Sequence, residues 1–199
     1  RDIPVLFMHG IYKGYPASSI YEDDVEAGYL ATKHLLELGH RKIAGIFKID
    51  DIQGHARYEG FFKAHKEIGA GLSDKRVLWF DTNDLLYKFS MQSGDIIIEF
   101  LEDCTAVVCY NEQISLKVID IIRERGINIP ERLSLVSFDD SELAVASEVK
   151  MTTVAHPKEN LGIEAAAIML KMITGDEKIF KVKMAPELVI RNSTGPVRG

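Results

Sequence analysis

Short apolar runs alternate with longer stretches of helical periodicity along the whole chain, and this alternation predicts its secondary structure. The apolar runs predict strands at 3–8, 42–47, 76–80, 105–110, 133–138, 149–154 and 188–191. The periodic stretches predict helices at 24–38, 56–67, 93–102, 112–125 and 158–173. Strands and helices in this order are typical of an α/β fold with mostly parallel sheet. The last residues, 193–199, are expected to form a frayed tail.

Two apolar strands that flank one amphipathic helix form the clearest unit of the chain. The strands are 105–110 and 133–138, and the helix between them is 112–125. A strand, helix and strand of this length predict a βαβ unit with parallel neighbouring strands. Asn111 and Asp139 directly follow the two strands. Because ligands of open α/β sheets bind beyond the carboxyl ends of the strands, both residues are candidates to face one ligand.

Composition limits the function classes. The 199 residues are 46% hydrophobic and 27% charged, as in a soluble globular protein of one large domain or two lobes. The net charge of -6 argues against nucleic-acid binding by this segment itself. Cys104 and Cys109 should point to opposite faces, so we expect reduced thiols, which fit a cytoplasmic setting. No apolar run reaches transmembrane length, and we expect no contact with a membrane.

The sequence lacks the short motifs of common α/β enzymes. It contains no G-x-G-x-x-G or G-x-x-x-x-G-K phosphate loop, no H-E-x-x-H, no Cys/His set for zinc and no G-x-S-x-G elbow. We therefore predict a binding protein rather than an enzyme, with no cofactor and no metal.

Five side chains are candidates for a binding site, and each also has a plain structural interpretation. Arg57 begins a helix, where the helix dipole disfavours a cation, so it either faces an acceptor in a cleft or forms a surface salt bridge. Phe89 in a polar loop either covers a core edge or stacks on a ligand. Asn111 is also a natural helix cap, and Asp139 an ordinary turn residue. His156 is also a plain loop residue before a helix.

Together these residues supply a guanidinium, an aromatic ring, an amide, a carboxylate and an imidazole. Such a set suits a sugar, because bidentate polar contacts recognise neighbouring hydroxyls and a ring covers the C–H face.

Several stretches, in one order along the chain, resemble the effector-binding domain of the LacI/GalR family of bacterial repressors. They are Asp23-Asp-Val-Glu-Ala-Gly-Tyr-Leu-Ala, Ala56-Arg-Tyr-Glu-Gly-Phe, Cys109-Tyr-Asn-Glu, Ile129-Pro-Glu-Arg-Leu-Ser-Leu-Val-Ser-Phe-Asp-Asp, Thr152-Thr-Val-Ala-His-Pro-Lys and Pro186-Glu-Leu-Val-Ile-Arg. The resemblance implies a two-lobed, periplasmic-binding-protein-like fold with mostly parallel sheets. By motif, it also implies that the effector contacts are Arg57, Phe89, Asn111, Asp139 and His156.

The resemblance further implies how the chain divides. Residues 1–44 and 156–179 would form part of the N-terminal lobe, and residues 45–155 and 180–199 the C-terminal lobe. The N-terminal lobe is expected to be incomplete in this segment and the DNA-binding domain not to be present. The segment alone is therefore expected to bind sugar weakly or not at all.

A narrower resemblance concerns the effector. Residues 45–54, 109–120 and 147–150 resemble the arabinose-responsive repressors of Gram-positive bacteria, which join a GntR-type winged helix to such a sensor. This implies a cytoplasmic homodimer that binds a monosaccharide, L-arabinose by expectation, and thereby controls operator DNA binding through an N-terminal domain. The alternative is a periplasmic or lipoprotein sugar-binding protein of a transport system.

Overall fold

The computed structural model describes residues 3–11, 14–90 and 94–198. They form two compact units. Unit 1 comprises Arg1–Asp23 and His156–Pro186, and unit 2 comprises Asp24–Ala155 and Glu187–Gly199. Both units contain parallel sheet and helix, so the predicted α/β class is confirmed.

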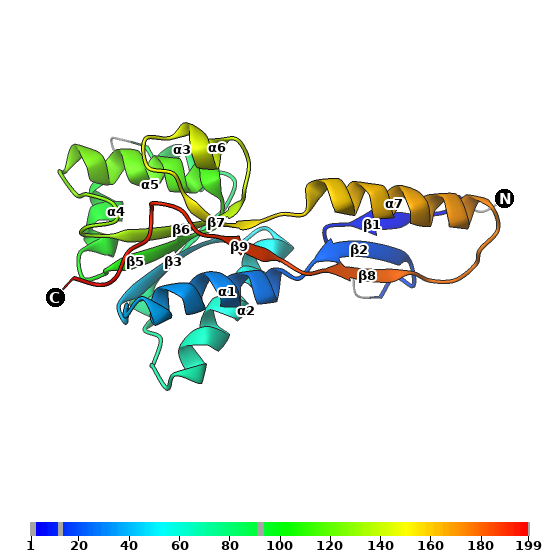
Figure 1. Cartoon of the computed structure of the whole chain (residues 1–199), viewed down its shortest axis with the longest axis horizontal. Helices are drawn as coiled ribbons and strands as arrows, with labels where there is room; N and C mark the ends of the chain where they lie inside the picture. The colour runs from blue at the N-terminus through cyan, green and yellow to red at the C-terminus, as the bar shows by residue number, and fades with distance from the viewer. Residues whose placement is uncertain (1–2, 12–13, 91–93, 199) are drawn as a thin grey trace. The chain divides into compact units, whose positions relative to one another are not determined.

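Unit 2 is built on a six-stranded sheet of order β4-β3-β5-β6-β7-β9 (Figure 1). The strands are β3 (Ile43–Lys48), β4 (Val77–Phe80), β5 (Ala106–Cys109), β6 (Ser134–Asp139), β7 (Thr152–Ala155) and β9 (Glu187–Val189). The first five are parallel, and β9 pairs antiparallel with β7. The carboxyl ends of the five parallel strands therefore meet at one edge of the sheet.

Helices cover both faces of this sheet. Helices α1 (Asp24–Glu37) and α2 (Ile52–Glu67) lie on one face, and α4 (Gly94–Leu101) and α5 (Glu112–Glu124) on the other (Figure 1). Shorter turns are η1 (Asp74–Arg76), α3 (Asp84–Tyr87) and α6 (Leu143–Ala146). Ser93, the predicted first residue of the helix before β5, lies outside the described residues.

The predicted βαβ unit is present as β5, α5 and β6. The two strands pair in parallel, with Val107 opposite Leu135. Helix α5 buries the apolar face that its periodicity predicted, including Ile114 and Val118. It ends before Gly126, whose φ of +71° is a left-handed conformation that suits glycine.

The backbones of α1 and α2 touch, because two glycines leave room for them. A Cβ on Gly28 would lie 2.0 Å from the carbonyl oxygen of Arg57, and a Cβ on Gly60 would lie 2.0 Å from that of Val25. No larger residue fits either position without separating the helices. This close approach brings Arg57 on α2 next to the first turn of α1.

Unit 1 is a three-stranded parallel sheet with one helix. Its strands β1 (Leu6–Met8), β2 (Ser18–Glu22) and β8 (Lys181–Met184) lie in the order β1-β2-β8. Helix α7 (Lys158–Ile173) covers one face (Figure 1). The buried core consists of Ile20, Leu161, Ala165 and Ile168. Strands β2 and β8 were not predicted, since serines open β2 and lysines alternate along β8.

The compact units and the predicted lobes share the limit between residues 155 and 156 but differ elsewhere. Unit 2 begins at Asp24 rather than at residue 45, because Ala27, Ala31 and Leu35 of α1 are buried in its core. Unit 1 continues to Pro186 rather than to residue 179, because β8 pairs with β2.

The expectation of a frayed tail after residue 193 is wrong for the described residues. Ser193 is fully buried, and its hydroxyl donates to the Leu135 carbonyl at 2.6 Å and accepts the Thr152 N–H at 2.8 Å. Further along, the N–H of Val197 donates to the carbonyl of Leu38 at 3.0 Å. The segment is therefore held to β6, to β7 and to the residue that follows α1, and the composition of the segment does not reveal these contacts.

Candidate functional site

A buried arginine lies at the carboxyl edge of the unit 2 sheet. The side chain of Arg57 is 3% exposed. Its Nε donates to Asp24 Oδ1 at 2.9 Å, and its Nη1 donates to the carbonyl of Tyr110 at 2.6 Å. Its Nη2 lies 3.4 Å from Asp139 Oδ1, and the guanidinium carbon lies 4.5 Å from the centre of the Phe138 ring. Arg57 thus faces two carboxylates and a carbonyl within unit 2. The prediction that it begins a helix is wrong, because α2 starts at Ile52 and Arg57 lies in its second turn.

The charge of Arg57 is stabilised by these neighbours. Burial alone would lower the pKa of the guanidinium, but the negative charges of Asp24 and Asp139 outweigh burial and raise the pKa above its ordinary value. The site thus contains a permanently charged, geometrically fixed donor.

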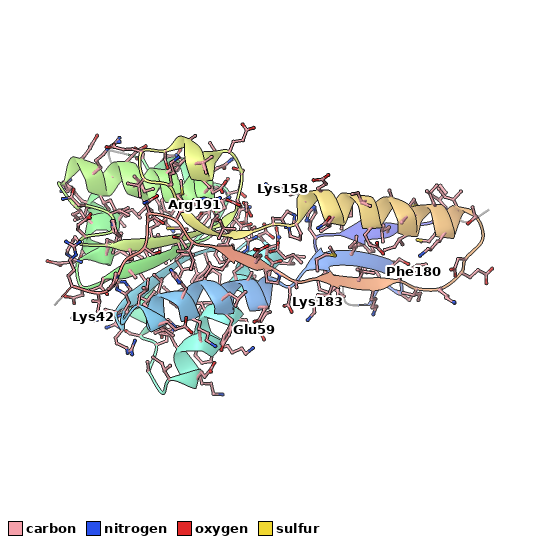
Figure 2. All side chains as sticks on the ribbon, in the orientation of Figure 1. Lys42, Glu59, Lys158, Phe180, Lys183 and Arg191 are labelled. Atoms are coloured by element: carbon pink, nitrogen blue, oxygen red, sulfur yellow. The ribbon has the colours of Figure 1, made fainter. Side chains whose placement is uncertain are left out.

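Asp139 and Asp140 adopt an unusual backbone. Their φ angles are +97° and +47°, a region that L-residues rarely adopt and that costs on the order of 1–3 kcal/mol per residue. The Asp139 side chain remains 34% exposed beside Arg57. Arg191, which follows β9 and is labelled in Figure 2, places its Nη1 2.7 Å from Asp140 Oδ1, an ion pair without hydrogen-bond alignment.

The loop after these residues is fastened by a buried glutamate. Glu112, the first residue of α5, is 2% exposed. Its Oε1 accepts the backbone N–H of Ser141 at 2.8 Å, and its Oε2 accepts the Ser141 hydroxyl. Sequence reasoning did not single out Glu112. An acidic residue directly after the capping Asn111 was the available signal.

Asn111 has the capping role, and it also lines a cavity. Its Oδ1 accepts the N–H of Ile114 at 3.0 Å, which caps α5. The half-buried side chain also borders a cavity of about 200 Å³ at the carboxyl ends of β3, β4 and β5. The cavity is lined by Lys48, Phe80, Thr82, Tyr110, Asn111, Gln113 and Ile114. The two interpretations of Asn111 are therefore compatible.

Tyr110 connects two strand-end loops and was also missed from the sequence. Its hydroxyl donates to Asp51 Oδ2 at 2.5 Å, and Asp51 Oδ1 caps α2 by accepting the N–H of Gln53 at 3.0 Å. Burial and the Asp51 carboxylate raise the pKa of the Tyr110 phenol well above its ordinary value, so the phenol stays a donor.

Phe89 lies in the core. It is 3% exposed, and its ring packs edge-on against Phe80 with centroids 5.3 Å apart. The core interpretation of this residue therefore describes its surroundings, and the ring offers almost no free face for stacking.

His156 belongs to unit 1, whereas the other four predicted site residues belong to unit 2. Its Nδ1 is in close contact with Oε2 of the buried Glu22. The ring centroids of His9 and His156 are 5.1 Å apart, and the backbone of His9 has a φ of +63°. Neither residue was predicted: Glu22 ends strand β2, which was not recognised, and His9 follows the predicted strand β1 without a local signal of its own.

Among residues 3–11, 14–90 and 94–198, no group of three or more His, Cys, Asp or Glu side chains is arranged to hold a metal ion. None of the helices formed by these residues is long and apolar enough to span a membrane.

Comparison with known proteins identifies the family. The sequence profile of the periplasmic binding protein-like domain matches residues 32–194. The chain is 40% identical to the arabinose metabolism transcriptional repressor of Halalkalibacterium halodurans, covering 100% of this chain and 54% of that protein. It is 37% identical to the repressor of the same description from Geobacillus stearothermophilus, covering 96% and 54%. The chain thus spans about half the length of these curated relatives.

Solved structures that resemble this chain indicate the same family. A LacI transcriptional regulator from a Rhodococcus species is 32% identical with a TM-score of 0.82, covering 98% of this chain and 70% of that one. A LacI family regulator from Enterococcus faecium with bound ribose is 27% identical with a TM-score of 0.83, covering 98% and 72%. The chain therefore belongs to the periplasmic binding protein-like domain family, among the effector-binding domains of LacI-family transcriptional regulators.

Proposed function

We propose that this chain is the sensor of a transcriptional repressor and binds a monosaccharide at the carboxyl edge of the unit 2 sheet, with L-arabinose as the first candidate. The observation that carries the proposal is the buried, charged Arg57 between Asp24 and Asp139. The choice of sugar follows from the two relatives described as arabinose metabolism repressors.

The chemistry of the edge suits a polyol. Each Nη atom of Arg57 carries a second hydrogen beyond the one it donates within unit 2, and Asp139 accepts hydrogen bonds from hydroxyls. Asn111 adds an amide at the rim of the neighbouring cavity. A planar donor beside a carboxylate recognises two adjacent hydroxyls at once.

We further propose a cytoplasmic homodimer that binds operator DNA through a domain outside this segment. A sugar that binds one arrangement of the repressor better than another shifts the population towards that arrangement. A coupling of about 1–3 kcal/mol between sugar and operator is enough for such control.

A sugar-binding protein of a transport system is the alternative, because the same fold serves both tasks. The relatives named above are transcriptional regulators, which favours regulation and argues against catalysis.

The test is a thermal-shift screen of the full-length protein against monosaccharides and nucleobases. We expect L-arabinose to raise Tm, and we expect Asp139→Asn to abolish that shift. Asp120→Asn, which alters an exposed carboxylate on α5, is the matched control and should leave the shift intact. A shift with a nucleobase and with no sugar would contradict the proposal.

A further inference from the structure

We propose that Glu112 is a positioning residue that holds Asp139 in the conformation in which its carboxylate meets Arg57. This inference rests on the proposed function, because it assumes that Asp139 contacts the sugar. Glu112 itself is buried and does not need to touch the ligand.

The contact is bidentate and reaches the backbone. Glu112 accepts both the N–H and the hydroxyl of Ser141, two residues after Asp139. The Ser141 hydroxyl oxygen also accepts the N–H of Leu143 at 3.2 Å, which starts α6. The Glu112 carboxylate therefore joins the first turn of α5 to Ser141, and the Ser141 hydroxyl in turn contacts the start of α6.

The turn needs such a restraint. Asp139 and Asp140 both have positive φ, and neither is a glycine. Without tertiary contacts, L-residues return to negative φ, which would turn the Asp139 side chain to a new direction. Three successive residues are held in place: Asp139 by Arg57, Asp140 by Arg191 and Ser141 by Glu112. Of these contacts, only that of Glu112 is made to a backbone N–H.

Helix α5 gives this restraint its rigidity. Its first turn follows directly on Asn111, which caps the same helix. An acidic residue in the first turn of a helix is favoured by the helix dipole. Asn111, which borders the cavity, and Glu112, which holds the Asp139 loop, are therefore adjacent residues at the start of α5.

The replacement of Glu112 distinguishes positioning from charge. Glu112→Ala removes both acceptors. Glu112→Gln keeps an oxygen for the Ser141 N–H, while its amide N–H can donate to the Ser141 hydroxyl oxygen. If Glu112 acts by positioning, Glu112→Gln should keep the sugar affinity that Glu112→Ala loses.

The test uses the full-length protein with L-arabinose as the probe in isothermal titration calorimetry. We expect Glu112→Ala to weaken binding at least about tenfold and Glu112→Gln to stay within about threefold of the unchanged protein. Glu124→Ala, an exposed carboxylate at the other end of α5, is the matched control and should bind normally. If Glu112→Ala does not fold, Glu112→Asp, which shortens the side chain, should show the same loss in weaker form.

Hydrogen exchange at the Ser141 amide gives a readout that does not depend on sugar. Protection should fall in Glu112→Ala and be retained in Glu112→Gln. Unchanged affinity in the alanine variant, or a glutamine variant that protects Ser141 yet binds as weakly as alanine, would overturn the inference. If the unchanged protein binds no sugar, the proposed function fails, and the exchange rates at Ser141, Asp140 and Asp139 alone decide whether Glu112 holds the loop.

Discussion

The two units contrast in how completely their sheets are covered. The sheet of unit 2 has a buried apolar cluster on each face, and β5 is buried along its whole length. In unit 1, the described residues bury only four apolar side chains, all between α7 and one face of the sheet. Helix α7 also exposes Ile163, Leu170 and Ile173 by 63%, 63% and 64%.

This difference explains where a precise site can form. A side chain keeps a fixed direction only if the elements that carry it are themselves fixed by packing. Asp139 ends a strand of the covered sheet, and Arg57 and Glu112 come from helices that pack on its two faces. We therefore expect unit 2 to tolerate changes at its strand ends poorly, and unit 1 to respond more mildly.

The largest effect should come from removing Arg57. Arg57→Ala leaves Asp24 buried without this cation, and breaking a buried ion pair from one side costs about 3–5 kcal/mol. Urea unfolding should show the loss. Arg123→Ala, which breaks an exposed i,i+3 pair on α5, should change stability by less than about 0.5 kcal/mol. Equal effects of the two variants would contradict the importance of the buried cluster.

Two glycines offer a matched comparison between the units. Gly28→Ala puts a Cβ 2.0 Å from the Arg57 carbonyl, so we expect a loss of about 1–3 kcal/mol or more. Gly162→Ala on α7 of unit 1 meets nothing within 4 Å, and alanine is the better helix former by up to about 1 kcal/mol. Thermal unfolding should therefore move in opposite directions. A shift of the same sign in both would weaken the contrast between the units.

Phe89→Leu separates the core role from a ligand role. Leucine is smaller than phenylalanine, so the buried position loses apolar contacts and keeps a small cavity, which costs about 1–2 kcal/mol. We expect this modest loss in urea unfolding, with an unchanged affinity for L-arabinose in calorimetry. A large fall in affinity with unchanged stability would return Phe89 to the set of stacking residues.

The smallest expected effect is a loss of stability against unfolding at low pH. Burial lowers the pKa of His34, His40 and His65, all in unit 2. Because their folded pKa values lie below the unfolded value of about 6.5, the unfolded chain binds more protons as pH falls below that value. Their contribution is therefore complete above about pH 6.5 and is lost as pH falls through the folded pKa values.

Urea unfolding between about pH 7 and pH 5 should show this decline, and His40→Asn should make it shallower. A pH profile with the same slope in the variant would show that His40 does not contribute. His40 is a suitable choice because its ring nitrogens contact Thr105 and Ser134 at the amino ends of β5 and β6, whereas the proposed sugar contacts lie at the carboxyl ends of these strands.

Pattern alone predicted the α/β class and the central unit of β5, α5 and β6. Both are strongly periodic, and their ends carry clear signals such as Asn111 and Gly126. Strand β2 was not predicted, because its first two residues, Ser18 and Ser19, are polar yet buried. Burial of a serine depends on partners distant in sequence, which no local pattern contains.

The candidate site was only partly predictable for the same reason. Arg57 was a candidate because the sequence placed it at a helix start, whereas the structure places it in the second turn of α2, beside the carboxylates of Asp24 and Asp139. Tyr110 gave no local signal, because its partner Asp51 is far away in sequence. The signal at Glu112 was only its place directly after the capping Asn111, which does not reveal its partner Ser141. Motif position suggested a ligand role for Phe89, but its burial follows from packing against Phe80.

The buried Ser193 has a consequence for synthesis of the protein. Unit 2 is discontinuous, and its β7 and β6 obtain hydrogen bonds from the segment that follows unit 1 in the chain. During translation, residues 24–155 leave the ribosome long before residue 193 does. The sheet of unit 2 can therefore gain its last strand, β9, only after all of unit 1 has been synthesised.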